Sequence, residues 1–205
     1  MDFTIASYAA WRADETSAKP DVSFIPPLER RRLTGVERAA LAVAWQVRPE
    51  GEVPVVFASR WGEIGVTLKL MTQFHADREM SPAGFSASVH NAAPGAFSLL
   101  THNHAPYTAI AARERSLEAG LLEALTQGVG VVFVFAEEAT PAFYAPAFGP
   151  LQPACALAVR LEPGGPCRAD FRAAECPPLS FDSADAFFSG RTDVLEAASF
   201  TLRWN

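Results

Sequence analysis

Cysteine and long apolar runs are both scarce in this chain of 205 residues. It has only three cysteines, Cys155, Cys167 and Cys176, and none of them stands in a C-x-x-C pair. An odd number of cysteines without that spacing argues against a disulfide framework and fits a reducing compartment. No apolar stretch is long enough to cross a bilayer, and the N-terminal "MDFTIASYAAW" lacks the basic start and uninterrupted apolar run of a signal peptide. We therefore expect a cytoplasmic protein without a membrane span.

Positive charge is also sparse. The chain has 17 lysines and arginines and 23 acidic residues, which gives a net charge of −6. The longest basic run is "ERRR" at Glu29–Arg32. Without an extended basic stripe, nucleic acid is not an expected partner. The short run fits a solvated face or a protein contact, and we favour the solvated face. Nearly half of the residues are hydrophobic, and no linker or repeat divides the chain, so a single domain over residues 1–205 is expected.

Five segments have the composition of β-strands, and the middle three are apolar almost throughout. Continuous apolar strands are typical of sheets covered on both faces, as in parallel α/β proteins. The five segments are Phe3–Trp11, Val53–Ser59, Tyr107–Ala112, Val129–Ala136 and Cys155–Leu161.

Helical patterns fall between these strands, as parallel crossovers require. The first follows Thr34, which has capping-box spacing to Glu37. The others cover Gly62–Gln73, Ser86–Leu100 and Ser116–Thr126. Pro94 should kink or break the third, and Gly120 and Ala124 permit close packing of the fourth. Three stretches read as loops: Asp14–Pro27, Ala139–Pro153 and Glu162–Leu179. The tail Ser180–Asn205 suggests a short helix and a terminal strand.

Histidine and serine motifs for catalysis or metal binding are weak in this sequence. His102 and His104 are two apart but have no third ligand nearby, so no metal is expected. His90 heads a helical pattern and is interpreted as a packed polar residue. The stretch "GFSAS" lacks both the glycine spacing and the preceding buried strand of a nucleophile elbow.

Three blocks of the sequence resemble a known family. They are "FIPPLERRRLTGVERAALAVA", "VVFASRWGEIGVTLKLM" and "SPAGFSASVHNAAPGAFSLLTHNHAPYTAIAARERSLEAGLLEAL". Their order is similar to that of short β-ketoacyl-synthase-like proteins, often labelled chain length factors, which correspond to the N-terminal half of the thiolase and ketosynthase superfamily. The resemblance implies an α/β fold with one thiolase-like half. Its sheet would have five mostly parallel strands, one of them antiparallel, with helices on both faces.

In full-length members of that family, the N-terminal half supplies a catalytic cysteine at the turn between the third strand and the following helix. The C-terminal half supplies two catalytic histidines. Here the handover reads Arg113-Glu114-Arg115, and the resemblance places Glu114 in the cysteine position. None of the three cysteines falls there, and the chain ends before the histidines would come. Condensation by this chain alone is therefore not expected. Glu114 would repel a malonyl carboxylate unless it were protonated or paired with Arg113 or Arg115, and it could equally serve only to stabilise its helix.

The leading hypothesis is a non-catalytic partner in a fatty-acid, polyketide or aryl-polyene type pathway, which pairs with a ketosynthase or with itself. The resemblance implies no cofactor, and it implies an acyl carrier protein as a further partner. The expected interface residues are Val89, Ala93, Ala96, Phe97, Thr108 and Ile110.

Two other functions stay open. One is an acyl-thioester decarboxylase or hydrolase that uses Glu114 with His90 or Ser116. The other is an acyl-chain binder in which Phe85 and Phe97, with the aromatic loop at Phe143, Tyr144 and Phe148, line a tunnel.

Overall fold

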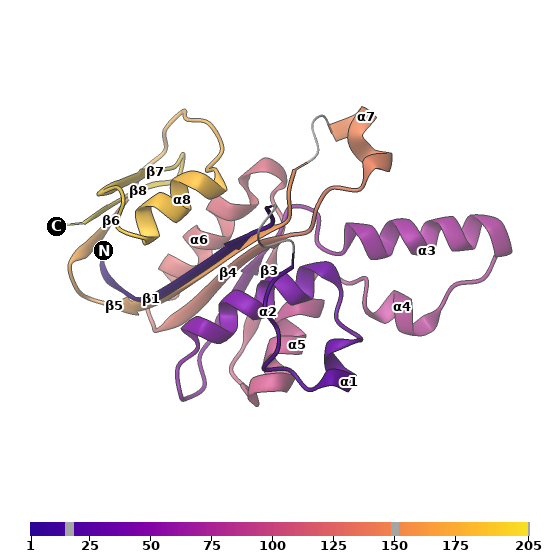
Figure 1. The fold of residues 1–205 in the computed structure, drawn as a ribbon. Helices are drawn as coiled ribbons and strands as arrows, with labels where there is room; N and C mark the ends of the chain where they lie inside the picture. Colours follow the sequence, from indigo (N-terminus) through magenta and orange to yellow (C-terminus); the bar gives the residue numbers. More distant parts are fainter. Residues whose placement is uncertain (15–18, 149–151, 205) are drawn as a thin grey trace.

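A single mixed β-sheet runs through the molecule (Figure 1). The computed structural model describes residues 1–14, 19–148 and 152–204, and these contain eight strands in the order β3-β2-β4-β5-β1-β6-β8-β7. The strands are β1 Asp2–Arg12, β2 Val55–Ala58, β3 Tyr107–Ile110, β4 Val131–Glu137, β5 Cys155–Pro163, β6 Cys167–Phe171, β7 Val194–Glu196 and β8 Phe200–Trp204.

All five strands expected from the sequence are present, and they lie next to one another as β3-β2-β4-β5-β1. β2 pairs in parallel with β3 and β4, whereas β5 runs antiparallel to both β4 and β1. One antiparallel strand among these five was expected and is confirmed.

The expectation of a five-stranded, mostly parallel sheet is nevertheless wrong. β6, β8 and β7 extend the sheet beyond β1, and each of these added pairings is antiparallel. β6 lies within Glu162–Leu179, which was expected to be a loop because of its clustered glycines and prolines, so that expectation is wrong for Cys167–Phe171. It is a short strand bounded by those residues, with buried and exposed positions alternating at its start.

Helices cover both faces of the sheet, as expected. α6 and α8 lie on the face that includes Val56, Ala58 and Phe133, and α2 and α5 lie on the opposite face, with Val55 and Phe57. The helices are α1 Pro27–Arg30, α2 Gly35–Val47, α3 Ile64–Asp77, α4 Pro82–Ser86, α5 Ala92–Thr101, α6 Ser116–Thr126, α7 Ala145–Phe148 and α8 Phe181–Phe188, with 3-10 turns at η1 Arg113–Arg115 and η2 Ala142–Tyr144.

The helix signals in the sequence are largely confirmed. Thr34 and Glu37 form the expected capping box at the start of α2, and α6 has the expected bounds. A single helix over Ser86–Leu100 is wrong, because the chain turns between α4 and α5. Pro94 instead lies in the first turn of α5, where a backbone N–H has no intrahelical partner to lose.

The segment between β2 and β3 projects from the body of the molecule as α3 and α4 (Figure 1). α3 buries only Ile64 and Leu70 along its 14 residues. Met71, Phe74 and Phe85 are exposed on this projection, so few contacts within the chain hold it.

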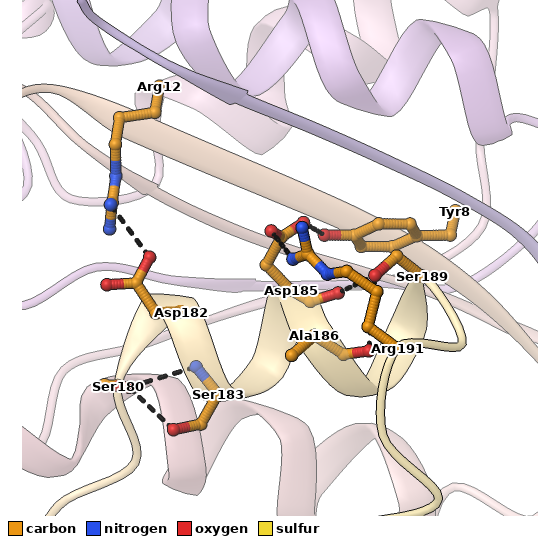
Figure 2. Close-up of polar contacts among 9 residues, drawn as sticks. All are labelled: Tyr8, Arg12, Ser180, Asp182, Ser183, Asp185, Ala186, Ser189 and Arg191. Carbon is orange, nitrogen blue, oxygen red and sulfur yellow. Dashed lines mark hydrogen bonds and ion pairs between the residues drawn. The ribbon is translucent and has the colours of Figure 1, made fainter.

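The C-terminal residues fold back onto β1 through α8. Figure 2 shows the phenol of Tyr8 and the guanidinium of Arg191 meeting the carboxylate of Asp185, while Arg12 pairs with Asp182 at 2.8 Å. Burial and the Asp185 carboxylate both raise the pKa of Tyr8, which keeps the phenol protonated as a donor. The expected short helix and terminal strand are confirmed as α8 and β8.

Both ends of the chain lie at the same side of the molecule (Figure 1). Phe3 pairs with Cys167 of β6, and Cys167 pairs on its other side with Trp204 of β8. Among the described residues, no helix combines the length and apolar character that a bilayer crossing requires. The expected loops at 14–27 and 139–153, and the tail, include residues 15–18, 149–151 and 205, which lie outside the described part of the chain.

Candidate functional site at the start of helix α6

The connection from β3 to α6 is a sharp turn that is stabilised by side-chain hydrogen bonds. Arg113 has a left-handed backbone with φ of 52°, a conformation that costs a non-glycine residue roughly 1 kcal/mol. The Ser116 hydroxyl donates to the Arg113 carbonyl at 2.7 Å and accepts from the Ala112 N–H at 2.9 Å. The expected corner is therefore present, and its strained residue is Arg113, one position before Glu114.

A pocket of about 330 Å³ opens beside this turn, between α6, the end of β4, the start of β5 and α8. Its walls include Arg60, Arg113, Glu114, Glu137, Cys155 and Phe181. Arg12, near the N-terminus, also lines the pocket, so residues from distant parts of the chain surround this turn.

Glu114 is held as an ion pair in this pocket. Its carboxylate lies 2.6 Å from the guanidinium of Arg60, which follows β2. The backbone N–H of Glu114 and the charge of Arg60 hold the pKa of Glu114 below its usual range. Arg113 adds to this effect, but the direct ion-pair partner is Arg60, which the sequence does not reveal. The other expected partner, Arg115, pairs instead with Glu118 at 2.8 Å.

Glu137 is a second pocket carboxyl, and sequence reasoning misses it. It ends β4 and accepts hydrogen bonds from the Ser59 hydroxyl at 3.1 Å and from the backbone N–H groups of Arg60 and Trp61. Burial raises the pKa of Glu137 to about 7, because desolvation outweighs these donors. The only signal in the sequence is a glutamate at the carboxyl end of an apolar strand.

The cysteines offer no nucleophile at the turn. Cys155 lines the pocket from the start of β5, and burial raises the pKa of its thiol to about 12, so the thiol stays protonated at neutral pH. Cys167 is buried in β6, and Cys176 is half-buried. All three are free thiols, and none lies in η1 or α6.

The structure does not bring His90 and Glu114 together in the pocket. The His90 imidazole lies 2.9 Å from the Ser59 carbonyl and packs edge-on against Phe57, which agrees with a packed polar role. Ser116 does line the pocket, but its hydroxyl is used within the turn. Among the described residues, no group of three or more histidine, cysteine or acidic side chains could hold a metal ion.

The expected interface residues divide into exposed and buried sets. β3 is an edge strand, with Thr108 exposed and Ile110 half-buried, and Val89 is 43% exposed. Ala93 and Phe97 are only 2% and 3% exposed, because α5 packs them against α2 and the sheet. Ala96 is half-buried on α5 and lines a surface groove.

The two phenylalanines expected to line an acyl tunnel lie apart. Phe85 is 60% exposed on α4, whereas Phe97 is buried under α5. Of the aromatic loop, the Phe148 ring packs at a tilt against Trp61 with ring centroids 4.2 Å apart, while Phe143 is 71% exposed. Trp61 lines the pocket, so the loop approaches the pocket through the contact between Phe148 and Trp61.

Comparisons with known proteins agree with this fold. One chain of a solved complex of the ketosynthase ApeO with its chain length factor ApeC, from Xenorhabdus doucetiae, is 22% identical with a TM-score of 0.77. The match covers 100% of this chain and 99% of that one. A chain of AntDE:AntF, a type II polyketide synthase acyl carrier protein in complex with its ketosynthase, is 13% identical with a TM-score of 0.61. It covers 83% of this chain and 69% of that one.

No curated protein matches the chain by sequence. The family model described as beta-ketoacyl synthase, N-terminal domain, matches residues 6–187. The chain therefore belongs to the family of beta-ketoacyl synthase N-terminal domains, with a thiolase-like α/β fold.

Proposed function

We propose that this chain is a non-catalytic, chain-length-factor-like partner of a ketosynthase in a fatty-acid, polyketide or aryl-polyene type pathway. The observation that carries the proposal is the corner before α6. A condensing enzyme needs a thiolate there, activated by the helix N-terminus. This chain has Arg113-Glu114-Arg115 instead, with Glu114 already bound to Arg60. A carboxylate held in this ion pair does not supply the thiolate on which an acyl thioester would form.

The size of the structural neighbour supports a pairing role. The chain from the ApeO and ApeC complex is matched over 99% of its length, so it is about as long as this chain. It comes from an assembly of a ketosynthase with a chain length factor. A protein of the same size and fold is thus found bound to a partner.

The free edge of β3 is the surface that we propose for this pairing. In the parallel ladder with β2, the Pro106 and Ile110 carbonyls accept from Val55 and Ser59 N–H groups. Because alternate residues of a strand point their backbone groups in opposite directions, Tyr107 and Ala109 direct theirs away from β2. An edge with free N–H and C=O groups is a template for a strand from a second protein.

A proline on this edge tests the pairing. Ala109→Pro removes an outward N–H without removing a bond to β2, and an edge strand tolerates such a change. We expect the variant to fold but to lose co-elution with a co-expressed ketosynthase of the same organism in size-exclusion chromatography. Val194→Pro, at the outward-facing position of the opposite edge strand β7, is the matched control and should keep the complex. Co-elution of Ala109→Pro at the wild-type level would contradict the proposal.

We further propose that an acyl carrier protein meets this assembly in the cytoplasm. The AntDE:AntF complex joins a carrier protein to a ketosynthase of similar fold. The odd number of cysteines fits a reducing compartment.

A further inference from the structure

Residues 59–65 connect β2 to α3 and belong to two parts of the molecule at once. Arg60 and Trp61 line the pocket beside α6. Glu63 is the N-cap residue of α3, which forms the projection together with α4 (Figure 1). Every residue of this segment is buried or half-buried. The segment is therefore a wall of the pocket and also the base of the projection.

Two neighbouring carboxyl groups at the end of β4 hold the two ends of this segment. Glu137 accepts the hydrogen bonds from its first residues that are described above. Glu138 accepts from the Gly65 N–H in the first turn of α3. A Cβ atom at Gly65 would lie 2.8 Å from a carboxylate oxygen of Glu138, so this contact requires glycine. Because the two acceptors are adjacent in the chain, they tie the pocket wall and the first turn of α3 to the same point of the sheet.

His90 brings the other end of the projection back to this segment. It follows α4, and its imidazole lies 2.9 Å from the Ser59 carbonyl. The Ser59 hydroxyl donates to Glu137, so Ser59 joins His90 to a side chain of the pocket. Gly62 has a left-handed backbone with φ of 53°, and a Cβ atom there would lie 2.9 Å from the imidazole ring. A continuous path of contacts thus leads from the projection to the pocket.

The body of the molecule covers little of the projection. α3 has two buried residues among 14, and the left-handed residues Gly62 and Arg78 stand next to its two ends. Movements of a helix are absorbed at a few such residues beside its ends. Burial raises the pKa of both Glu137 and Glu138, and this desolvation cost offsets part of what their hydrogen bonds contribute. Because few buried contacts hold it, the projection can shift at a low cost in free energy.

We infer that residues 59–65 form a hinge that couples the position of the α3–α4 projection to the opening of the pocket beside α6. A shift of the projection would move Ser59 and Gly62, and with them the Arg60 wall of the pocket. A molecule that displaced Arg60 would in turn loosen the base of the projection. The coupling acts in both directions because it is a single free-energy difference. It is a property of this chain by itself, so it goes beyond the proposed pairing.

Labelling of Cys155 measures the opening of the pocket, because this thiol lines the pocket and is 8% exposed. The test uses the full chain with Cys176→Ser, which removes the half-buried thiol, and follows modification of Cys155 by iodoacetamide with peptide mass spectrometry. We expect His90→Ala to speed this labelling roughly fivefold, because it removes the contact with Ser59 at the far end of the path.

Two further variants control for the loss of a histidine. His90→Gln keeps a donor for the Ser59 carbonyl and should restore most of the wild-type labelling rate. His75→Ala removes an exposed histidine from α3 itself and should leave the rate unchanged.

Hydrogen exchange tests the coupling in the opposite direction. Glu137→Gln alters the pocket end of the path, and we expect the amides of α3 to exchange roughly fivefold faster in this variant. Glu175→Gln, at an exposed site, is the matched control and should exchange as the wild type does. If Glu137→Gln does not fold, the His90 variants decide the question.

Equal labelling of Cys155 in His90→Ala and His75→Ala would overturn the inference, as would unchanged exchange of α3 in a folded Glu137→Gln. Exchange that rises in β1 and β5 as much as in α3 would reveal a general loss of stability and would also reject the hinge.

Discussion

Glu63 is a carboxyl group buried with only one of its two oxygens hydrogen-bonded. It stands at the N-cap position of α3, is 3% exposed, and accepts from the Thr34 hydroxyl at 2.9 Å. Its other carboxyl oxygen has no hydrogen-bond partner in the described part of the chain. Burial raises the pKa of Glu63 to about 8, and the nearby Glu37 and Glu138 carboxylates add to this effect. Glu63 is therefore largely protonated at neutral pH.

This buried carboxyl makes stability depend on pH. Its pKa is about 8 in the folded chain against an ordinary value of 4.5, so folding binds a proton between these limits. The contribution of Glu63 to stability is fully present below about pH 4.5 and is lost progressively as the pH rises to about 8. Glu63→Gln cannot ionise and should escape this loss.

We expect Glu63→Gln to be more stable than the wild type at every pH in this range. The difference in the free energy of unfolding should grow from pH 5 to pH 8, where it reaches roughly 3 kcal/mol. Thermal unfolding across this pH series measures the margin. Glu79→Gln, at an exposed site, is the control and should show no growing margin. A constant difference between Glu63→Gln and wild type would contradict the assignment.

The residues of the candidate site could be predicted only in part. Glu114 could be located because it lies within a local strand-to-helix pattern. Arg60 could not, because it is 54 residues away in sequence and meets Glu114 only through the pairing of β2 with β3. Glu137 is likewise brought to the pocket by the neighbouring strand β4. Long-range contacts of this kind leave no periodicity in the sequence.

At the level of helices and strands, close packing of α6 on the sheet depends on Gly120. A Cβ atom at this position would lie 2.5 Å from the Ala58 Cβ and 2.7 Å from the Phe133 ring. Neither neighbour can move freely, because both side chains are fully buried in the sheet. The close approach that the sequence suggested for Gly120 is therefore confirmed.

Two glycine substitutions separate packing from helix propensity. Gly120→Ala should lower the free energy of unfolding by about 2 kcal/mol, because the clash exceeds the gain in propensity. Gly95→Ala in α5 would meet only the Tyr107 hydroxyl, at 3.6 Å, and should raise stability by about 0.5 kcal/mol. Urea unfolding measures both. Equal effects of the two changes would show that α6 does not pack as described.

The strength of local signals explains which elements the sequence predicts. The strands at β2 and β4 are continuous apolar runs with helices on both sides, so pattern and fold agree. β6 and β7 have five and three residues and border prolines, glycines or polar turns, so their pairing depends on β1 and β8 rather than on their own composition. The break between α4 and α5 was missed because apolar spacing continues across it.

Across the whole molecule, Glu118 ties the corner before α6 to the C-terminal strands. It is 2% exposed and accepts from Arg115 at 2.8 Å, from the Ser199 N–H at 3.0 Å and from the Ser199 hydroxyl at 2.8 Å. Ser199 belongs to the turn between β7 and β8. This carboxylate therefore joins segments that are 81 residues apart.

Removing this link should loosen the C-terminal part of the sheet. We expect Glu118→Ala to cost about 3 kcal/mol, because it removes a buried carboxylate that accepts three hydrogen bonds, one of them from a cation. Ser199→Ala keeps the backbone N–H and should cost only about 1 kcal/mol. Chemical denaturation with hydrogen exchange at β7 and β8 measures both. A loss below 1 kcal/mol for Glu118→Ala would mean that the strands hold without this contact.

The position of the two chain ends has a practical consequence. Phe3 and Trp204 flank the same residue of β6, so the ends lie two strand spacings apart, about 10 Å. A linker of a few residues could join them into a circular permutant, with new ends opened between α3 and α4. All strand pairings would be retained, and a fluorophore or affinity handle at the new ends would sit on the projecting helices.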